Sequence, residues 1–179
     1  MKDETATWNV DLGHSSVNFR VRHLAIGQVT GVFSTFKGQI KSDNDGFEGA
    51  KINFEISADS INTNNAQRDE HLKSDIFFDT KQFPEIAFIG NLEKQDEKYL
   101  LNGQLSIHGV TKDILMDAEF LGTDKGRFGE KRAAFEVKGN INRKDFGLTW
   151  NMLSEAGGIL IGEEIKLHIY IQAIAHNPL

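Results

Sequence analysis

The stretch Ile165–Ala173, IKLHIYIQA, alternates strictly between two kinds of side chain. Apolar residues occupy every second position, and Lys166, His168, Tyr170 and Gln172 lie between them. Successive side chains of a β-strand point to opposite faces, so this period predicts a strand with one buried side and one solvent-facing side.

The same alternation recurs along the chain, whereas helical periodicity is nearly absent. The other apolar rows are Val17, Phe19 and Val21; Ile52, Phe54 and Ile56; Ile86, Phe88 and Leu92; Leu101, Leu105 and Ile107; Ile114, Met116, Ala118 and Phe120; and Phe135, Val137 and Ile141. Turn-forming stretches such as Asp43–Gly46 and Gly122–Gly126 separate these rows. With the segment Gly27–Lys41 they predict about eight antiparallel strands, which form either a sandwich or a closed barrel.

The composition is that of one globular domain, residues 1–179, with 39% apolar and 26% charged residues. Seventeen glycines against two prolines suit a sheet that bends and turns often. The formal charge of −6 argues against nucleic-acid binding and against electrostatic adhesion to anionic lipid. The absence of cysteine removes disulfides, thiolate metal sites and cysteine nucleophiles.

The apolar runs of the sequence are far shorter than the roughly 20 residues of a membrane span. The first ten residues, MKDETATWNV, lack the apolar core of a signal peptide. We therefore expect a cytoplasmic location for the chain as written, and a periplasmic location if a leader has been removed.

Two segments depart from the strand pattern. Asn64–Lys73 combines an asparagine cap with good helix formers, and Thr149–Glu155 predicts a second short helix or turn. The first segment overlaps RDEHLKSDIFFD, residues 68–79, in which charged groups directly precede Ile76, Phe77 and Phe78. Such a stretch could form a catalytic loop, a metal loop, or a lid with one apolar face.

The charged groups form no local metal or catalytic motif in the sequence. No two histidines have the i, i+4 helical or i, i+2 strand spacing that presents both imidazoles to one ion. Asp69, Glu70 and His71 are consecutive, so on a helix they diverge by about 100° each. The basic residues between Lys125 and Arg132 predict a solvated hairpin. We therefore expect neither a metal nor a catalytic residue.

The apolar inventory is the more unusual feature, with thirteen phenylalanines beside two tyrosines. A barrel of about eight strands can either fill its interior with side chains or hold one ligand.

Four ordered motifs resemble the YceI-like family, whose members are lipocalin-like barrels associated with polyisoprenoid binding. They are HSSVNFRVRHLAIGQVTGVFSTFKGQI from residue 14, RDEHLKSDIFFDTKQFPEIAF from residue 68, LSIHGVTKDI from residue 105 and INRKDFGLTW from residue 141. The similarity runs from about Trp8 to Ala175, and it favours the lid among the three hypotheses for residues 68–79.

The resemblance implies an all-β, lipocalin-like antiparallel barrel with one or two short helices and an internal tunnel. The ligand is expected to be a long-chain isoprenoid or similar amphiphilic lipid, with a diphosphate or quinone head group, and no other cofactor is expected. Strand parity and the resemblance together select the tunnel wall: Phe19, Val21, Phe33, Phe54, Ile56, Phe88, Leu105, Ile107, Met116, Phe135 and Trp150. Arg68, His71 and Arg143 are expected near the mouth, where they could meet the head group.

Transient membrane contact at most is expected of such a carrier, and its oligomeric state stays open between monomer and homodimer. Two alternative functions remain at this point. One is a barrel enzyme that acts on a prenyl phosphate through His71 with Asp69 or Asp145. The other is a structural protein whose interior is packed solid.

Overall fold

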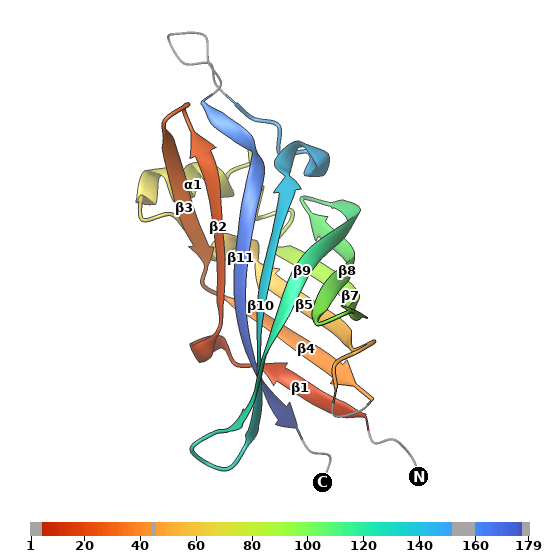
Figure 1. Cartoon of the computed structure of the whole chain (residues 1–179). Coiled ribbons are helices and arrows are strands. Elements are labelled where there is room, and N and C mark those ends of the chain that lie inside the picture. The colour runs from red at the N-terminus through yellow and green to blue at the C-terminus, as the bar shows by residue number, and fades with distance from the viewer. Residues whose placement is uncertain (1–4, 44–45, 152–159, 177–179) are drawn as a thin grey trace.

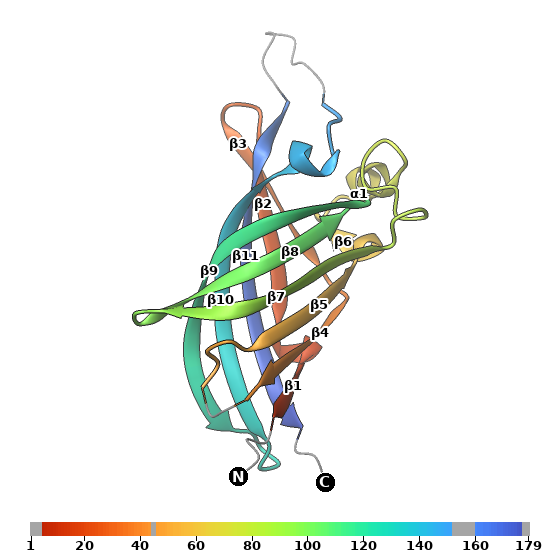
Figure 2. The ribbon, with the colours of Figure 1, turned by 90° about the vertical axis from the view of Figure 1, so that its right-hand side faces the viewer.

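The computed structural model describes residues 5–43, 46–151 and 160–176, which form one continuous antiparallel sheet (Figures 1 and 2). Its strands are β1 (Ala6–Val10), β2 (Ser16–His23), β3 (Gly27–Phe33), β4 (Phe36–Ser42), β5 (Lys51–Ser57), β6 (Ile61–Asn62), β7 (Glu85–Gln95), β8 (Lys98–Ile107), β9 (Val110–Lys125), β10 (Lys131–Asn142) and β11 (Ile161–His176). The helices of the described residues are α1 (Ala66–Lys73) and the 3₁₀ turns η1 (Leu12–His14), η2 (Ala58–Ser60) and η3 (Arg143–Phe146).

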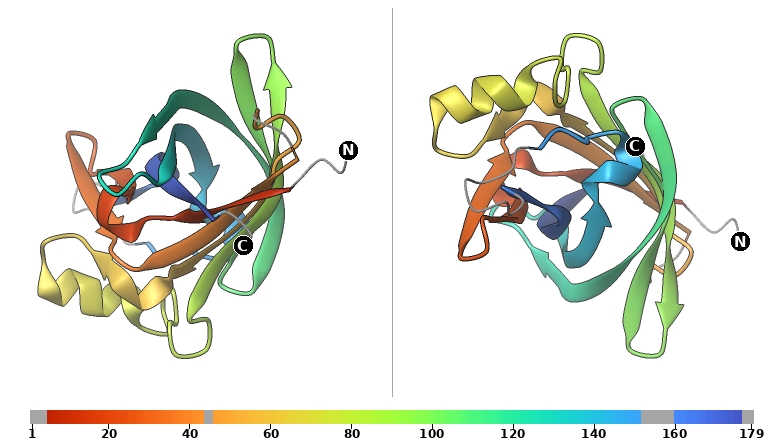
Figure 3. Two further views of the ribbon diagram at one scale, coloured as in Figure 1. Left: turned by 90° about the horizontal axis from the view of Figure 1, so that it is seen from below. Right: turned by 90° about the horizontal axis from the view of Figure 1, so that it is seen from above.

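Eight of the strands form a closed ring in the order β1-β4-β5-β7-β8-β9-β10-β11, which β1 completes by pairing with β11 (Figure 3). Strand β11 is long enough to have two successive partners on the same edge. Its residues Ala173–His176 pair with β1, and its residues from Ile161 to Tyr170 pair with β2. Strands β2, β3 and β6 therefore extend the wall beyond the ring at one end, and the predicted barrel is confirmed.

Period-two alternation gives the barrel its apolar interior, as the sequence predicts. Directly paired residues such as Val137 and Ile169, or Val17 and Phe33, face inward together. The buried residues divide into two clusters along the barrel axis. One surrounds Trp8 and Phe47 near β1, and the other surrounds Phe33 and Phe146 near α1 and η3.

Helix α1 begins where the sequence predicts, and its cap is Asn65, whose side chain accepts a hydrogen bond from the Arg68 N–H. Figure 1 shows α1 and η3 at the end of the barrel opposite β1. The second predicted helix is not seen in its described part, because Thr149–Asn151 are not helical. Residues 152–155 of that prediction lie outside the described residues.

Candidate functional site

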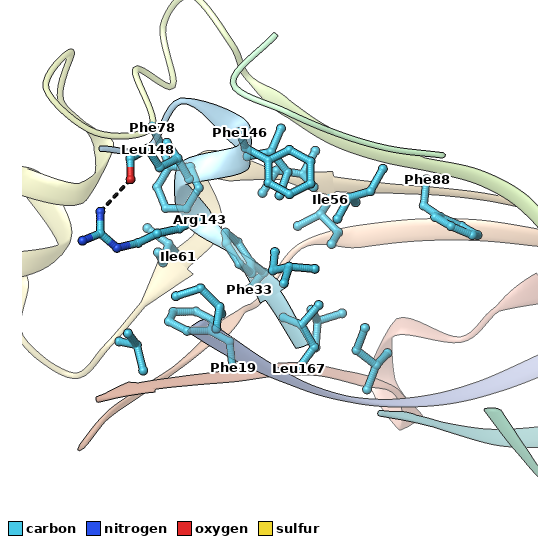
Figure 4. Close-up of a pocket in the computed structure, with 18 of the residues that line it drawn as sticks. Phe19, Phe33, Ile56, Ile61, Phe78, Phe88, Arg143, Phe146, Leu148 and Leu167 are labelled. Carbon is cyan, nitrogen blue, oxygen red and sulfur yellow. Dashed lines mark hydrogen bonds between the residues drawn. The ribbon is translucent and has the colours of Figure 1, made fainter. Parts of the chain in front are cut away.

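The barrel contains an elongated cavity of about 550 Å³, lined largely by apolar side chains. Its wall runs from Met116 and Phe135 in the barrel to Arg68, His71 and Trp150 at the α1 end. Figure 4 shows lining side chains that converge from several strands and from η3. The alternative of a solid interior is therefore wrong, since inward residues surround a space instead of filling it.

All fourteen residues selected from the sequence lie on this wall. They are Phe19, Val21, Phe33, Phe54, Ile56, Phe88, Leu105, Ile107, Met116, Phe135, Trp150, Arg68, His71 and Arg143. Their contact with a ligand stays a prediction.

The segment after α1 forms one side of the cavity. Phe77 is 7% exposed, and its ring meets that of Phe78 edge to face with centroids 5.2 Å apart. Phe78 in turn meets Phe33 of β3 at 6.1 Å, and both Phe77 and Phe78 line the cavity. Ile76, by contrast, is 50% exposed. Alternation as in a strand would place only one of the two rings inward, but residues 75–78 form a turn, so both rings face the cavity and Ile76 does not anchor the segment.

Polar contacts with Thr63 hold the start of helix α1 in place within the lid segment, residues 64–79. Arg68 donates from Nε to Thr63 Oγ1 at 2.8 Å and from Nη2 to the Thr63 carbonyl at 2.8 Å. Asp69 Oδ1 accepts hydrogen bonds from the Thr63 N–H at 2.9 Å and from its hydroxyl at 2.6 Å. Asp69, one of the groups of the enzyme alternative, therefore serves to hold α1 against the end of β6.

Arg143 is the largest fully buried side chain, at 1% exposure. Its Nη1 donates to the carbonyl oxygens of Leu148 and Trp150 at 2.6 and 2.9 Å, and the first bond is drawn in Figure 4. Its Nε donates to Gly162 O at 2.9 Å, and its Nη2 donates to Ile161 O at 3.3 Å. Burial lowers the pKa of this guanidinium below its ordinary value.

Four of the five N–H donors of Arg143 thus bind backbone carbonyls on both sides of residues 152–159. The guanidinium also lies over the Phe77 ring, 6.0 Å from its centroid. This geometry gives Arg143 a structural role at the mouth, which the sequence reasoning did not anticipate. A lipid head group that bound Arg143, as predicted, would have to use the same guanidinium that already binds these four carbonyl oxygens.

Several wall residues were missed from the sequence. Phe146 and Leu148 of the η3 region are 2% and 4% exposed and line the cavity, as do Ile165, Leu167 and Ile169 of β11. The β11 residues carry a clear signal, since their alternation is the strongest in the chain. Phe146 and Leu148 carry none, because a 3₁₀ turn has no period from which an inward face can be read.

Within residues 5–43, 46–151 and 160–176, no three His, Asp or Glu side chains lie close enough together to hold a metal ion. The absence of a metal in the working protein stays a prediction. None of the helices in the described part of the chain has the length and apolar character needed to cross a membrane.

A closed antiparallel ring of eight strands around an apolar cavity defines a lipocalin-like barrel. Comparison with known proteins identifies the family: the model of the YceI-like domain matches residues 8–173, and the chain belongs to this family. A UPF0312 protein of Photorhabdus laumondii is 37% identical over 144 residues, which cover 79% of this chain and 75% of that protein. Protein YceI of Salmonella newport is 35% identical over 90% of this chain and 82% of its own.

Solved structures show the same fold. The YCEI protein of Campylobacter jejuni is 34% identical, with a TM-score of 0.74 over 87% of this chain and 90% of that one. BcnA of Burkholderia cenocepacia is only 17% identical but has a TM-score of 0.78 over 91% of this chain and 98% of its own. A polyisoprenoid binding domain from Saccharophagus degradans has a TM-score of 0.69 at 17% identity, over 94% and 98% of the two chains.

Proposed function

We propose that the protein binds one isoprenoid, or a comparable amphiphilic lipid, inside the barrel and carries it. The cavity of about 550 Å³ is the observation that carries this proposal. Its volume lies in the range of about 300–1,000 Å³ of small-molecule sites. Family membership and the shared fold of a domain described as polyisoprenoid binding support the same ligand class.

The distribution of polar groups supports one orientation of such a ligand. The cationic or titratable side chains of the wall are Arg22, His23, Arg68, His71 and Arg143, which come from β2, α1 and η3, whereas the wall near Met116 and Phe135 is apolar. The chain of the lipid would therefore lie in the barrel, and its polar head would lie near α1. A diphosphate would be attracted to the arginines by charge, and a quinone would accept hydrogen bonds from the arginines and histidines.

The energetics favour a carrier that exchanges lipid with membranes. Each buried CH₂ contributes about 0.8 kcal/mol when the reference is water. A bilayer, however, is as apolar as the cavity, so the transfer of a chain from one to the other is nearly neutral. Binding strength then depends on the head group and on the fit of the chain.

Organic extraction of the purified protein, followed by lipid mass spectrometry, tests the proposal. The expected result is one class of isoprenoid in near-stoichiometric amount. Delipidated protein should then take up geranylgeraniol, with quenching of fluorescence from Trp150, which lines the cavity. A protein that carries no lipid and takes up neither isoprenoid alcohols nor quinones would refute the proposed function.

A further inference from the structure

Several glycines of the barrel wall lie behind large side chains that line the cavity. Gly31 of β3 is directly paired with Phe19 of β2, and both residues face inward. A Cβ atom at Gly31 would overlap Cζ of the Phe19 ring. The ring therefore occupies a recess at residue 31 that a side chain at this position would fill.

The same arrangement occurs at Gly38 of β4, which is directly paired with Phe54 of β5. A Cβ atom there would lie 2.5 Å from Cδ2 of the Phe54 ring. This distance is well inside the roughly 3.5–4.0 Å separation at which carbon atoms attract each other.

Gly139 of β10 gives a third example with an aliphatic side chain. A Cβ atom at this position would lie 2.5 Å from Cγ and 2.9 Å from Sδ of Met116, on the neighbouring strand β9. Phe19, Phe54 and Met116 all belong to the cavity wall. In each pair, the large side chain thus lies between a glycine and the cavity.

The pair Gly90 and Gly103 repeats the pattern beneath Phe88, whose Cζ would lie 2.6 and 2.8 Å from the two added Cβ atoms. Here the strands also approach so closely that an added Cβ would meet backbone atoms. This pair is therefore required by the backbone as well, and it is unsuitable for testing the recess alone.

Glycine in a strand destabilises the sheet relative to alanine, because it loses more conformational freedom on folding. At Gly31 and Gly38 the backbone does not require glycine through a positive φ, since neither has one. The group that an added Cβ would meet most closely is the facing ring at both positions, followed by Thr63 Cγ2 at Gly31 and Val10 Cγ2 at Gly38, each at 3.0 Å.

We propose that Gly31, Gly38 and Gly139 are specificity-determining residues that set the bore of the cavity. Each accommodates a large side chain against the wall, and alanine at any of them would push that side chain into the lumen. The width of the cavity that these glycines maintain admits a chain with methyl branches, as in an isoprenoid. A narrower cavity would still admit a thinner, unbranched chain. This inference deepens the proposed function and rests on it for the identity of the ligand.

The test compares geranylgeraniol, which is methyl-branched, with hexadecan-1-ol, which is not, by displacement of the apolar dye N-phenyl-1-naphthylamine. One methylene of misfit in an apolar pocket changes binding by about 10- to 200-fold, so Gly38→Ala and Gly31→Ala should each weaken geranylgeraniol binding about tenfold or more. Binding of hexadecan-1-ol should change much less. Gly13→Ala is the matched control, because its Cβ would meet only Asp11 Oδ1 at an ordinary 3.5 Å.

Removal of the displaced ring should reverse the effect. Gly38→Ala combined with Phe54→Ala should recover geranylgeraniol binding, and Phe54→Ala alone should raise the ratio of branched to unbranched binding above that of the unaltered protein. If Gly38→Ala fails to fold, the ratio of geranylgeraniol binding to hexadecan-1-ol binding in Phe54→Ala tests the proposal. A ratio equal to that of the unaltered protein would overturn it. Folded glycine variants that bind both alcohols normally also overturn it.

The dye separates this inference from the proposed function. If the unaltered protein takes up the dye but no isoprenoid, the proposed function fails. A loss of dye uptake in Gly38→Ala that Phe54→Ala restores would then still establish that the glycine sets the bore. Dye uptake that does not respond to either substitution would refute it.

Discussion

The His71 imidazole meets the Trp150 indole edge to face, with ring centroids 4.5 Å apart. His71 belongs to α1, and Trp150 belongs to the segment whose carbonyls Arg143 binds. The lid segment is thus connected to the Arg143 site through one aromatic contact, and to the same site again through Phe77 beneath the guanidinium. Since no residue of α1 is fully buried, the lid segment is attached by these ring contacts together with the hydrogen bonds of Arg68 and Asp69 to Thr63.

Loss of the Phe77 ring should release the lid segment without unfolding the barrel. Full burial of such a side chain contributes about 1.5–3 kcal/mol, and local opening needs less free energy than global unfolding. Phe77→Ala should therefore raise amide hydrogen exchange in residues 64–79 and speed lipid exchange with vesicles, while the strands stay protected. Ile76→Ala is the control, because Ile76 is 50% exposed and its removal should change neither measurement. Equal lipid kinetics in the two variants would contradict a lid.

A polar side chain on the cavity wall should reduce lipid uptake more than it reduces folding. Phe88 and Ile89 are adjacent on β7, but Phe88 is 7% exposed and faces the cavity, whereas Ile89 is 64% exposed. Phe88→Gln places an amide in an apolar cavity, which costs about 1–3 kcal/mol unless it finds a partner. Ile89→Gln should leave geranylgeraniol binding and the melting temperature close to their original values. Global unfolding of Phe88→Gln would instead indicate that this part of the interior behaves as solid core.

Replacement of Arg143 should lower the free energy of unfolding strongly. Its removal takes a donor from the buried Leu148 carbonyl and from the part-buried carbonyls of Trp150 and Gly162, and one unsatisfied buried group costs about 1–3 kcal/mol. We expect Arg143→Met to lose about 3–5 kcal/mol in urea unfolding, a cost comparable to that of breaking a buried charged network. The exposed Arg20→Met on β2 should stay within about 0.5 kcal/mol. If Arg143→Met kept its stability but lost affinity for a prenyl diphosphate, Arg143 would be a head-group ligand instead.

A charged cluster near β1 should make stability depend on acid pH. Arg132 Nη1 donates to Asp11 Oδ2 at 2.8 Å, and this hydrogen bond, opposed in part by desolvation, lowers the pKa of Asp11 below its ordinary value. A lowered folded-state pKa means that the stabilisation is complete above the unfolded-state pKa of about 3.9 and is lost as the pH falls through the folded value. Urea unfolding of Asp11→Asn should therefore show a shallower loss of stability below about pH 4 than the unaltered protein.

The partner substitution provides the control for that experiment. Arg132 makes the largest of the contacts that lower the pKa of Asp11, beside His14 Nδ1 at 2.8 Å and the Gly13 N–H at 3.1 Å. Arg132→Met should therefore reduce the acid dependence due to Asp11, and Asp11→Asn should change stability less in that background than in the unaltered protein. Additive effects of the two substitutions would contradict a shared interaction. Lys125, Arg127 and Lys131 are exposed, as the predicted solvated hairpin requires, whereas Arg132 departs from that prediction because it also binds Glu130 and Gln172.

Strand parity located most of the candidate site because inward and outward residues alternate over most of each long strand, with register shifts only near Phe135 and between Ile161 and Ile165 in the described part of the sheet. Phe54, Phe88 and Phe135 could each be placed on the wall from their neighbours alone. Strand β1 was missed because its five residues offer only a short alternation around Trp8. Phe146 and Phe78 could not be placed in the same way, since each lies in a turn where no period operates.

By itself, then, the sequence determined the long strands, their apolar faces and the helix that begins after Asn65, because these depend on local alternation and capping. Only the tertiary structure decided that β11 divides its pairing between β1 and β2, which is what closes the barrel. It also decided that Arg143 binds carbonyls up to 19 residues away and that Gly38 accommodates the Phe54 ring. These relationships join residues that are distant along the chain. They depend on the distance between atoms of neighbouring strands and turns, and that distance is set only once the chain has folded.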